Sequence, residues 1–359
     1  MIGILGAYGA TGIWATRFIK NNSNNSLRIG GRNIDKAPQE LREEWKDAEW
    51  VKVNVSDKES VEKFINGCET ILDCAKLSVE QTKHMDEIAE AKGVSVLHLG
   101  IAGFERQESK VPIFYGTGAI PGLSGLIPQY LSKKFDHVTS LEFYYGGLGA
   151  FSYTAANDFI DSLHNDDNRT MVYWKNGEIL PFEPSANDYS EDLKSVIPIN
   201  KMFPFFDGEA EAITRKLNID EARFHMCLSG KRMIEIMNSA RHQYKQNPDE
   251  TIKKLCTASK LDTFGIKENT FYLCIMEGVK DNAPAKFKMT VSGLGPSPLT
   301  GVSAGAATLC LTKDAKNCKT ILLGESDLAT PIIDSLIANE PDFSCEIKDM
   351  NAIEIEGEI

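Results

Sequence analysis

The sequence predicts an α/β protein: an N-terminal Rossmann domain, which is a doubly wound parallel sheet, and a second α+β domain built on a mixed or antiparallel sheet. Three observations predict this class. Roughly the first hundred residues alternate short apolar runs with amphipathic stretches, a pattern typical of right-handed βαβ units. A glycine-rich turn directly follows the first apolar run. After about residue 120 the regular alternation ends, and strands follow without crossover helices.

The first hundred residues contain five short apolar runs that predict buried strands, and a helical stretch is predicted between each strand and the next. The helix after the third strand is expected to begin at Asp57, whose side chain can cap it, and it carries Val61, Phe64 and Ile65 on one face. Further helices are predicted up to about Lys20, over 37–45 and over 79–92. The predicted strands are 2–5, 26–30, 50–55, 70–74 and 94–98.

The second half predicts a sheet with one face toward water and covering helices. In the run 285–291, Phe287, Met289 and Val291 alternate with polar residues, which is the period of a strand with one buried face. The predicted strands are 140–145, 171–174, 222–227, 270–279 and 285–291, and the predicted helices are 153–164, two between 231 and 262, 300–312 and 326–338.

Length and composition bound the function. The 359 residues fit about two domains at roughly 150 residues each, and 42% hydrophobic with 25% charged residues is the mix of a globular protein. With 39 Lys and Arg against 51 Asp and Glu, the net charge is −12, which argues against nucleic acid as the main partner. An anionic small molecule would need a local basic site.

The sequence predicts a cytoplasmic protein without a membrane span. No stretch approaches the roughly 18 apolar residues of a membrane helix, and the N-terminus lacks the features of a signal peptide. The eight cysteines form no CxxC pair and no Cys/His spacing typical of a metal site. We therefore expect reduced cysteines and no metal.

The strongest functional signal is the segment GAYGATG at 6–12, between the first strand and the first helix. The pyrophosphate of a dinucleotide binds to backbone N–H groups at a helix N-terminus, and glycines allow its close approach. The alternative is a tight structural turn. At the end of the second strand, the segment GGRN at 30–33 has no acid to accept a ribose hydroxyl, whereas Arg32 suits a 2′-phosphate. We therefore expect NADP(H) as the cofactor; the alternative for Arg32 is a solvated surface residue.

The candidate catalytic residues lie at the carboxyl ends of the fourth and fifth strands: Lys76 shortly after the fourth, and His98 as the last residue of the fifth. Lys76 could orient a carbonyl or carboxylate, or act as an acid or base, and His98 could contact the cofactor or transfer a proton. The alternatives are a solvated lysine and a buried, hydrogen-bonded histidine, and Asp73 is interpreted as a capping or loop acid. In the second domain, aromatic and basic side chains could hold an acid. These candidate substrate residues are Tyr145, Arg223 and His225.

The glycine-rich segment 116–125 leads into a helix and could approach the nicotinamide carboxamide or a substrate carboxylate; an interdomain hinge is the alternative. The complete expected cofactor site is Gly6, Tyr8, Gly9, Ala10, Thr11, Gly12, Gly31, Arg32, Asn33, Asn54, Val55, Ala75, Pro121 and Gly122.

Together these segments resemble the saccharopine dehydrogenase-like family of NADP-dependent oxidoreductases. The resemblance is carried by GAYGATG, GGRN, VKVNVSD at 51–57, ETILDCAKL at 69–77, GAIPGLSGLIPQYL at 118–131, FYYGGLG at 143–149 and LTGVSAGAATLCL at 299–311. The family's Tyr-x-Asp after the fifth strand is absent here, where the chain reads LHLG at 97–100.

The resemblance implies a Rossmann NADP-binding domain over 1–120 and an α+β domain for substrate binding and dimerisation over 121–298. The C-terminal helices within 299–359 would return at least partly to the Rossmann domain, and the protein would form a homodimer. The implied reaction is hydride transfer between NADP(H) and a C=N (imine) bond that links an amino acid or amine to an oxo acid. The alternatives are reduction of C=C or C=O in another small molecule, or a non-catalytic NADP(H)-binding sensor.

Overall fold

The computed structural model describes residues 1–164, 169–185, 189–195, 199–313 and 318–351. Its internal contacts divide the chain into two compact units, each with its own sheet, which confirms the predicted fold class. Unit 1 comprises Met1–Leu126 and Ser297–Glu340, and unit 2 comprises Ile127–Pro296 and Pro341–Ile359. The expected domain boundaries after residues 120 and 298 stay predictions.

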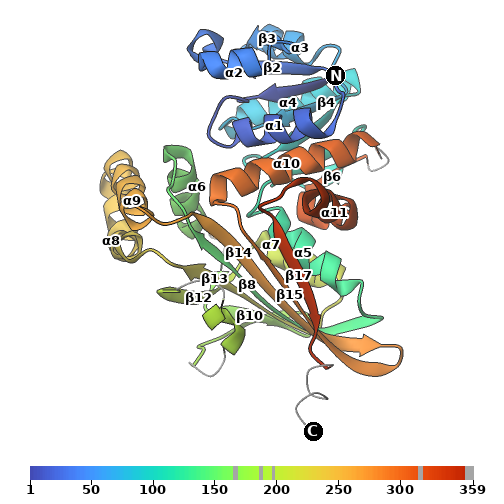
Figure 1. Ribbon diagram of the computed structural model, residues 1–359, viewed down its shortest axis with the longest axis vertical. Coiled ribbons are helices and arrows are strands. Elements are labelled where there is room, and N and C mark those ends of the chain that lie inside the picture. The colour runs from blue at the N-terminus through green and yellow to red at the C-terminus, as the bar shows by residue number, and fades with distance from the viewer. Residues whose placement is uncertain (165–168, 186–188, 196–198, 314–317, 352–359) are drawn as a thin grey trace. The chain divides into compact units, whose positions relative to one another are not determined.

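Unit 1 contains an eight-stranded sheet in the order β3-β2-β1-β4-β5-β7-β16-β6, of which Figure 1 labels β2, β3, β4 and β6. All neighbours are parallel except β16 and β6. The five predicted strands are present, although the third is shorter than the predicted 50–55. The strands are β1 Ile2–Leu5, β2 Leu27–Gly31, β3 Glu49–Lys52, β4 Thr70–Asp73, β5 Ser95–His98, β6 Gln107–Glu108, β7 Ile113–Tyr115 and β16 Lys319–Leu322.

Local signals set the helix ends of unit 1. Asp57 caps α3 as expected, since its side chain accepts a hydrogen bond from the Glu59 amide. Ser78 and Gln81 form a capping box at the start of α4, and Gly93 ends this helix with a positive φ. The helices are α1 Gly12–Asn22, α2 Gln39–Glu44, α3 Lys58–Ile65, α4 Val79–Lys92, α11 Ala329–Asn339 and the 3₁₀ turns η1 Ile34–Lys36 and η4 Leu323–Glu325.

Two helices include residues of both units: α5 (Leu123–Ser132) and α10 (Pro296–Lys313). The part of α10 in unit 1 packs against α1 through glycines, and Figure 1 shows the two helices side by side. A Cβ atom at Gly301 would lie 2.4 Å from the Thr11 carbonyl oxygen, and one at Gly305 would lie 3.0 Å from the Phe18 Cβ. The small residues of the predicted helix 300–312 therefore allow close helix packing.

Unit 2 is built on a mixed sheet in the order β11-β10-β13-β8-β14-β15-β17, with β12 paired to β13 and β9 to β12. Only β8 and β13 are parallel neighbours. The strands are β8 His137–Leu148, β9 Arg169–Thr170, β10 Val172–Lys175, β11 Glu178–Pro181, β12 Lys201–Phe206, β13 Glu221–Leu228, β14 Asn269–Lys280, β15 Ala283–Ser292 and β17 Ser344–Asp349. The helices are α6 Tyr153–His164, η3 Glu191–Ser195, α7 Gly208–Lys216, α8 Lys231–Gln246 and α9 Pro248–Asp262.

The alternating run at 285–291 forms β15, and its apolar residues are buried as expected. Its outer edge is covered, because residues 287–292 pair with β17. On the polar face, Lys288 forms an ion pair of 2.6 Å with Asp192. The homodimer stays a prediction. No helix in the described part of the chain is long and apolar enough to cross a membrane.

Candidate functional site

The glycine turn between β1 and α1 requires glycine at residues 6 and 12 and is tight at residue 9. Gly6 has a φ of +75°, and a Cβ there would lie 3.1 Å from the backbone of Cys74 and Ala75. A Cβ at Gly12 would lie 2.2 Å from the Gly6 carbonyl oxygen, and one at Gly9 would lie 3.2 Å from the same atom. Because backbone atoms lie this close to the three glycine Cα positions, the GxxGxxG spacing allows a compact turn.

The N-terminus of α1 is open to a ligand. Thr11 occupies the N-cap position, but no side-chain cap hydrogen bond is present there. Gly9 and Ala10 are exposed, and α1 has no acidic residue in its first turn. Uncapped N–H groups at the positive end of a helix bind phosphate, so this turn has the geometry that a pyrophosphate needs.

The end of β2 lies next to this turn, as parallel strand order requires. Gly31 is the last residue of β2 and is buried, whereas Arg32 and Asn33 are exposed. The Arg32 guanidinium forms no hydrogen bond or ion pair with any residue that the structure describes. It therefore has no internal carboxylate to satisfy and can reach an anion in solvent.

The candidates after β3 are held by local bonds. The Asn54 carboxamide oxygen accepts from the Ser56 amide at 3.2 Å, and the Asn54 amide donates to the Ser60 hydroxyl at 2.9 Å. Val55 is half-buried beside them. The Asn54 carboxamide oxygen thus stabilises its own turn. Asn54 is exposed, so its carboxamide NH₂ group could still contact a cofactor.

Behind the carboxyl ends of β4 and β5 lies a buried cluster of charged and polar side chains. His98 is 2% exposed, and its ring bonds Asp73 through Nδ1 at 2.9 Å and Asp86 through Nε2 at 2.8 Å. The Tyr115 hydroxyl donates to the second oxygen of Asp86, and the Tyr115 ring lies 4.7 Å from the His98 ring. These four residues come from β4, α4, β5 and β7, and we call them the His98 cluster.

The two carboxylates make His98 a cation. Burial by itself lowers the pKa of His98, but the hydrogen bonds that the ring donates to Asp73 and Asp86, and the charges of these carboxylates, outweigh it and raise the pKa to about 9. Burial and the neighbouring Asp86 also raise the pKa of the Tyr115 hydroxyl, which stays protonated. Both ring nitrogens of His98 are therefore engaged as donors, and a direct proton transfer to a ligand would first require one of these bonds to break.

Asp73 connects the His98 cluster to the loop that carries Lys76. Its other carboxylate oxygen accepts from the Ala75 amide at 2.9 Å, and the Cys74 amide donates to the Leu5 carbonyl. The loop is thereby fixed against β1 and under Gly6. Lys76 follows directly and is exposed, as a residue that contacts a ligand must be.

The segment 116–125 forms a compact turn over 116–122 and then the start of α5. Gly116 has a φ of +62° and Gly122 a φ of +128°, and a Cβ at Gly122 would lie 2.2 Å from the Gly118 carbonyl oxygen. Thr117 donates to the His98 carbonyl through both its amide and its hydroxyl, at 3.0 Å each. This turn, with Pro121 next to Gly122, is tied to the end of β5.

The three candidate substrate residues of unit 2 do not form one site. In the sheet register His225 pairs with Tyr144, so Tyr145 lies on the opposite face, because side chains alternate along a strand. Arg223 shares the His225 face, with its guanidinium 4.9 Å from the Phe182 ring. Tyr145 and His225 are both buried. The structure thus brings together Arg223 and His225 and separates them from Tyr145.

His225 is enclosed by aromatic rings. Its ring stacks on Tyr144 at 4.6 Å and lies 5.4 Å from the Tyr189 ring, and neither of its nitrogens has a hydrogen-bond partner among the described residues. Burial, and secondarily the Arg223 charge, lower the pKa of His225 to about 3. His225 is therefore a neutral core residue in this structure.

The sequence reasoning missed three members of the His98 cluster. Asp73 was interpreted as a capping or loop acid, and Asp86 and Tyr115 were not singled out. The one available signal was a buried strand that ends in a carboxylate beside another that ends in histidine, since adjacent parallel strands bring such ends together. Asp86 lies in an ordinary helical pattern, so nothing local distinguishes it.

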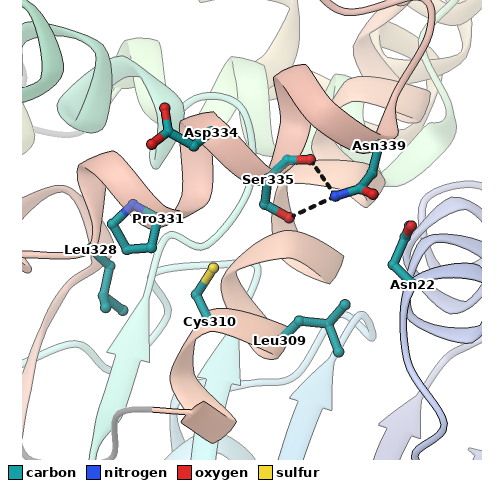
Figure 2. Close-up of a pocket in the computed structure, with 8 residues that line it drawn as sticks. All are labelled: Asn22, Leu309, Cys310, Leu328, Pro331, Asp334, Ser335 and Asn339. Carbon is teal, nitrogen blue, oxygen red and sulfur yellow. Dashed lines mark hydrogen bonds between the residues drawn. The ribbon is translucent and has the colours of Figure 1, made fainter.

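A surface cavity of about 740 Å³ lies elsewhere in unit 1 (Figure 2). Asn22 lines it at the end of α1, which is roughly 15 Å from the glycine turn at the rise of a helix. Its other lining residues are Leu309, Cys310, Leu328, Pro331, Asp334, Ser335 and Asn339. In the described part of the chain, no group of three or more His, Cys, Asp or Glu side chains is arranged to hold a metal ion.

Comparison with solved structures defines the fold as the two-domain fold of saccharopine dehydrogenase. Apo saccharopine dehydrogenase (L-Glu forming) from Saccharomyces cerevisiae superposes with a TM-score of 0.65 over 97% of this chain and 99% of its own, at 13% identity. Homospermidine synthase from Legionella pneumophila in complex with NAD gives 0.55 over 97% and 91%, at 10% identity. No protein-family model and no curated protein sequence matches this chain. The fold-level resemblance expected from the sequence is confirmed.

Proposed function

We propose that this protein is an NADP(H)-dependent oxidoreductase that transfers hydride to or from a C=N bond between an amine or amino acid and an oxo acid. The observation that carries the proposal is the open N-terminus of α1, which follows the glycine turn and lies beside the unpaired Arg32. The fold agrees with it, because the yeast saccharopine dehydrogenase and the NAD complex of homospermidine synthase share this architecture over nearly the whole chain.

The residues of unit 1 fit a dinucleotide. The Gly9 N–H donates to the Gly6 carbonyl within the turn, so the backbone N–H groups of residues 10–12 would bind the pyrophosphate. Arg32 with Asn33 would bind the 2′-phosphate through charge-assisted hydrogen bonds. Ala75, Pro121 and Gly122 belong to turns fixed to the ends of β4 and β5, where ligands bind in open α/β sheets. The bound nicotinamide supplies or accepts the hydride.

Lys76 is the residue that we assign to the substrate. Its ammonium group can orient a substrate carboxylate by charge, or hold a proton for the amine nitrogen. His98 fits a positioning role: it fixes Asp73, which fixes the Ala75 amide and so the start of the loop that presents Lys76.

A fluorescence titration with NADPH and separately with NADH tests the cofactor assignment. We expect preference for NADPH, and a loss of about tenfold or more in NADPH affinity for Arg32→Ala, because a charge-assisted hydrogen bond is removed. NADH affinity should not change. Lys110→Ala is the matched control, since Lys110 is an exposed cation between β6 and β7, strands that lie on the other side of β1 from β2 in the sheet order.

Preferential NADH binding would contradict the assignment of Arg32, and binding of neither cofactor would make the glycine turn purely structural. Screening of paired amine and oxo-acid pools for NADPH consumption then tests the reaction. Tight NADPH binding without turnover on any pool would instead favour a non-catalytic sensor.

A further inference from the structure

Gly31 has an unusual environment for the last residue of a nucleotide-binding strand. Dinucleotide folds that bind an unphosphorylated ribose place an acidic side chain near this point of the second strand. The φ of Gly31 lies outside the left-handed region, so its backbone accepts any L-residue. Glycine at residue 31 is therefore explained by the lack of room for a side chain and not by backbone conformation.

The Tyr8 side chain fills that space. A Cβ at Gly31 would lie 2.2 Å from the Tyr8 hydroxyl oxygen and 2.7 Å from its Cε1 and Cζ atoms. Contacts under about 3.0 Å are not found for real Cβ atoms, so any side chain at residue 31 requires Tyr8 to move. The Tyr8 hydroxyl thus occupies the position at which a carboxyl-bearing side chain would begin.

An aromatic stack keeps the Tyr8 ring in place. The Trp50 ring lies 6.3 Å from the Tyr8 ring at an interplanar angle of 27°. Trp45, which is fully buried, also stacks on Trp50, at 6.0 Å. The Trp50 indole also donates to the Trp45 carbonyl, and the Arg42 guanidinium lies 5.2 Å from the Trp50 ring. Moving Tyr8 would disturb this stack, so Tyr8 is not a freely rotating surface side chain.

The hydroxyl group has chemistry opposite to that of a carboxylate. A carboxylate only accepts hydrogen bonds and therefore selects a 2′-hydroxyl, whereas a tyrosine hydroxyl can donate to a phosphate oxygen. The Tyr8 hydroxyl has no hydrogen bond to any described residue, and neither has the neighbouring Arg32 side chain. Tyr8, which lies against Gly31, and Arg32, the next residue in the chain, thus both offer donors that no described residue uses.

We propose that Tyr8 determines cofactor preference: it excludes a carboxylate at residue 31, and its hydroxyl donates to the 2′-phosphate of NADP(H) together with Arg32. This inference rests on the proposed function, because it assigns a selective role to one residue of the same site. The inference goes beyond the proposed function because it links the glycine turn to the end of β2 through the Tyr8 side chain.

The first experiment removes only the donor. We expect Tyr8→Phe to weaken NADPH binding about tenfold and to leave NADH binding within twofold, because the ring and its stack remain while a hydrogen bond to a charged group is lost. Tyr153→Phe, on an exposed tyrosine of unit 2, is the matched control and should change neither titration. Unchanged NADPH binding by Tyr8→Phe would overturn the donor role.

The second experiment tests the steric role without a cofactor. Gly31→Ala should lower the thermal unfolding midpoint by several degrees in the native background and in Tyr8→Phe, and have little effect in Tyr8→Ala, where the ring is absent. If Gly31→Ala is neutral in all three backgrounds, the steric exclusion is wrong.

A third variant joins the two roles. Gly31→Asp combined with Tyr8→Ala should bind NADH better than NADPH, whereas Gly31→Asp alone should bind both poorly. NADH binding by Gly31→Asp alone at the level of the double variant would overturn the inference while leaving the proposed function intact. Failure of the unsubstituted protein to bind either cofactor would overturn the proposed function and the donor role, and the thermal data would still decide the steric role.

Discussion

Asp73 shows how much one side chain determines at the residue scale. One of its oxygens bonds the His98 imidazolium and the other accepts from the Ala75 amide, so the carboxylate joins a buried cation to the loop beneath the glycine turn. A neutral residue of the same shape could make the second bond but would leave His98 with a single carboxylate. The loop conformation at Lys76 therefore depends on charges that are themselves hidden from solvent.

Removal of Lys76 tests the direct substrate role. We expect Lys76→Ala to lower NADPH-coupled turnover at least about a hundredfold, the contribution typical of a positioned acid, base or charge, with NADPH affinity within twofold. The measurement is steady-state kinetics beside a cofactor titration. Lys110→Ala should retain full turnover, and an active Lys76→Ala variant would move the proton-handling role to another residue.

Replacement of His98 tests its positioning role through pH. Its pKa is raised to about 9 from a usual value near 6.5, so its stabilising effect is complete below about pH 6.5 and is lost as the pH rises through 9. We expect His98→Gln to lower the free energy of unfolding by roughly 3 kcal/mol at pH 6 and by much less above pH 9, measured by urea denaturation.

His84→Gln, on a half-buried histidine of α4, provides the control and should not reproduce the loss of unfolding free energy that His98→Gln shows at pH 6. A His98→Gln variant that keeps its stability at pH 6 but loses turnover would instead assign His98 a direct chemical role.

At the scale of elements, α10 acts on the cofactor turn from a distant part of the sequence. Gly301 lies against the Thr11 carbonyl, immediately before the start of α1, and Gly305 packs on Ala15 and Phe18 one turn later. The position of the α1 N-terminus thus depends on a helix nearly three hundred residues further along the chain. Small residues are needed because the two helix backbones approach closely.

Substitution of Gly301 tests this packing. Gly301→Ala places a Cβ 2.4 Å from the Thr11 oxygen and should destabilise unit 1 by about 1–3 kcal/mol, the usual effect of overpacking, and weaken NADPH binding. Thermal unfolding and cofactor titration measure the two effects. Gly100→Ala is the control, because its Cβ would meet nothing within 4 Å. Equal behaviour of the two variants would contradict the packing argument.

The late strands were the elements that sequence patterns did not reveal. β16 adds to the sheet of unit 1 and β17 to the sheet of unit 2, although only residues 323–343, which contain η4 and α11, separate them. β17, with the pattern Ser-Cys-Glu-Ile-Lys-Asp, is polar because it is an edge strand, so it has no apolar run to mark it. β16 is short, and its position beside β7 depends on contacts remote in sequence.

At the scale of the whole molecule, two buried histidines make the free energy of unfolding depend on pH in opposite directions. His98 in unit 1 is stabilising as a cation, and His225 in unit 2 is tolerated only as a neutral ring. Because the pKa of His225 falls to about 3, the unfolded chain binds a proton below about pH 6.5 that the folded chain does not. Unit 2 should therefore lose stability on acidification and unit 1 on alkalinisation.

Substitution of His225 tests the acid limb. We expect His225→Leu to reduce the loss of unfolding free energy between pH 6.5 and about pH 4.5 by up to roughly 3 kcal/mol, since each pH unit across a depressed pKa contributes about 1.4 kcal/mol. Urea denaturation across this range is the measurement. His137→Gln, on a partly exposed histidine of β8, is the control, and an unchanged acid dependence of His225→Leu would contradict the assignment.

The sequence by itself determined the fold class, the glycine turn and most strands, because these follow from local periodicity and from turn residues at fixed spacing. The sequence also identified Lys76 and His98 as candidates, since both lie at or just after the carboxyl ends of predicted strands. Only the tertiary structure decided that His98 is enclosed by Asp73 and Asp86, that Tyr145 and His225 face opposite sides of a sheet, and that Tyr8 covers Gly31. Burial, pKa and side-chain packing depend on residues far apart in the chain, so no local pattern contains them.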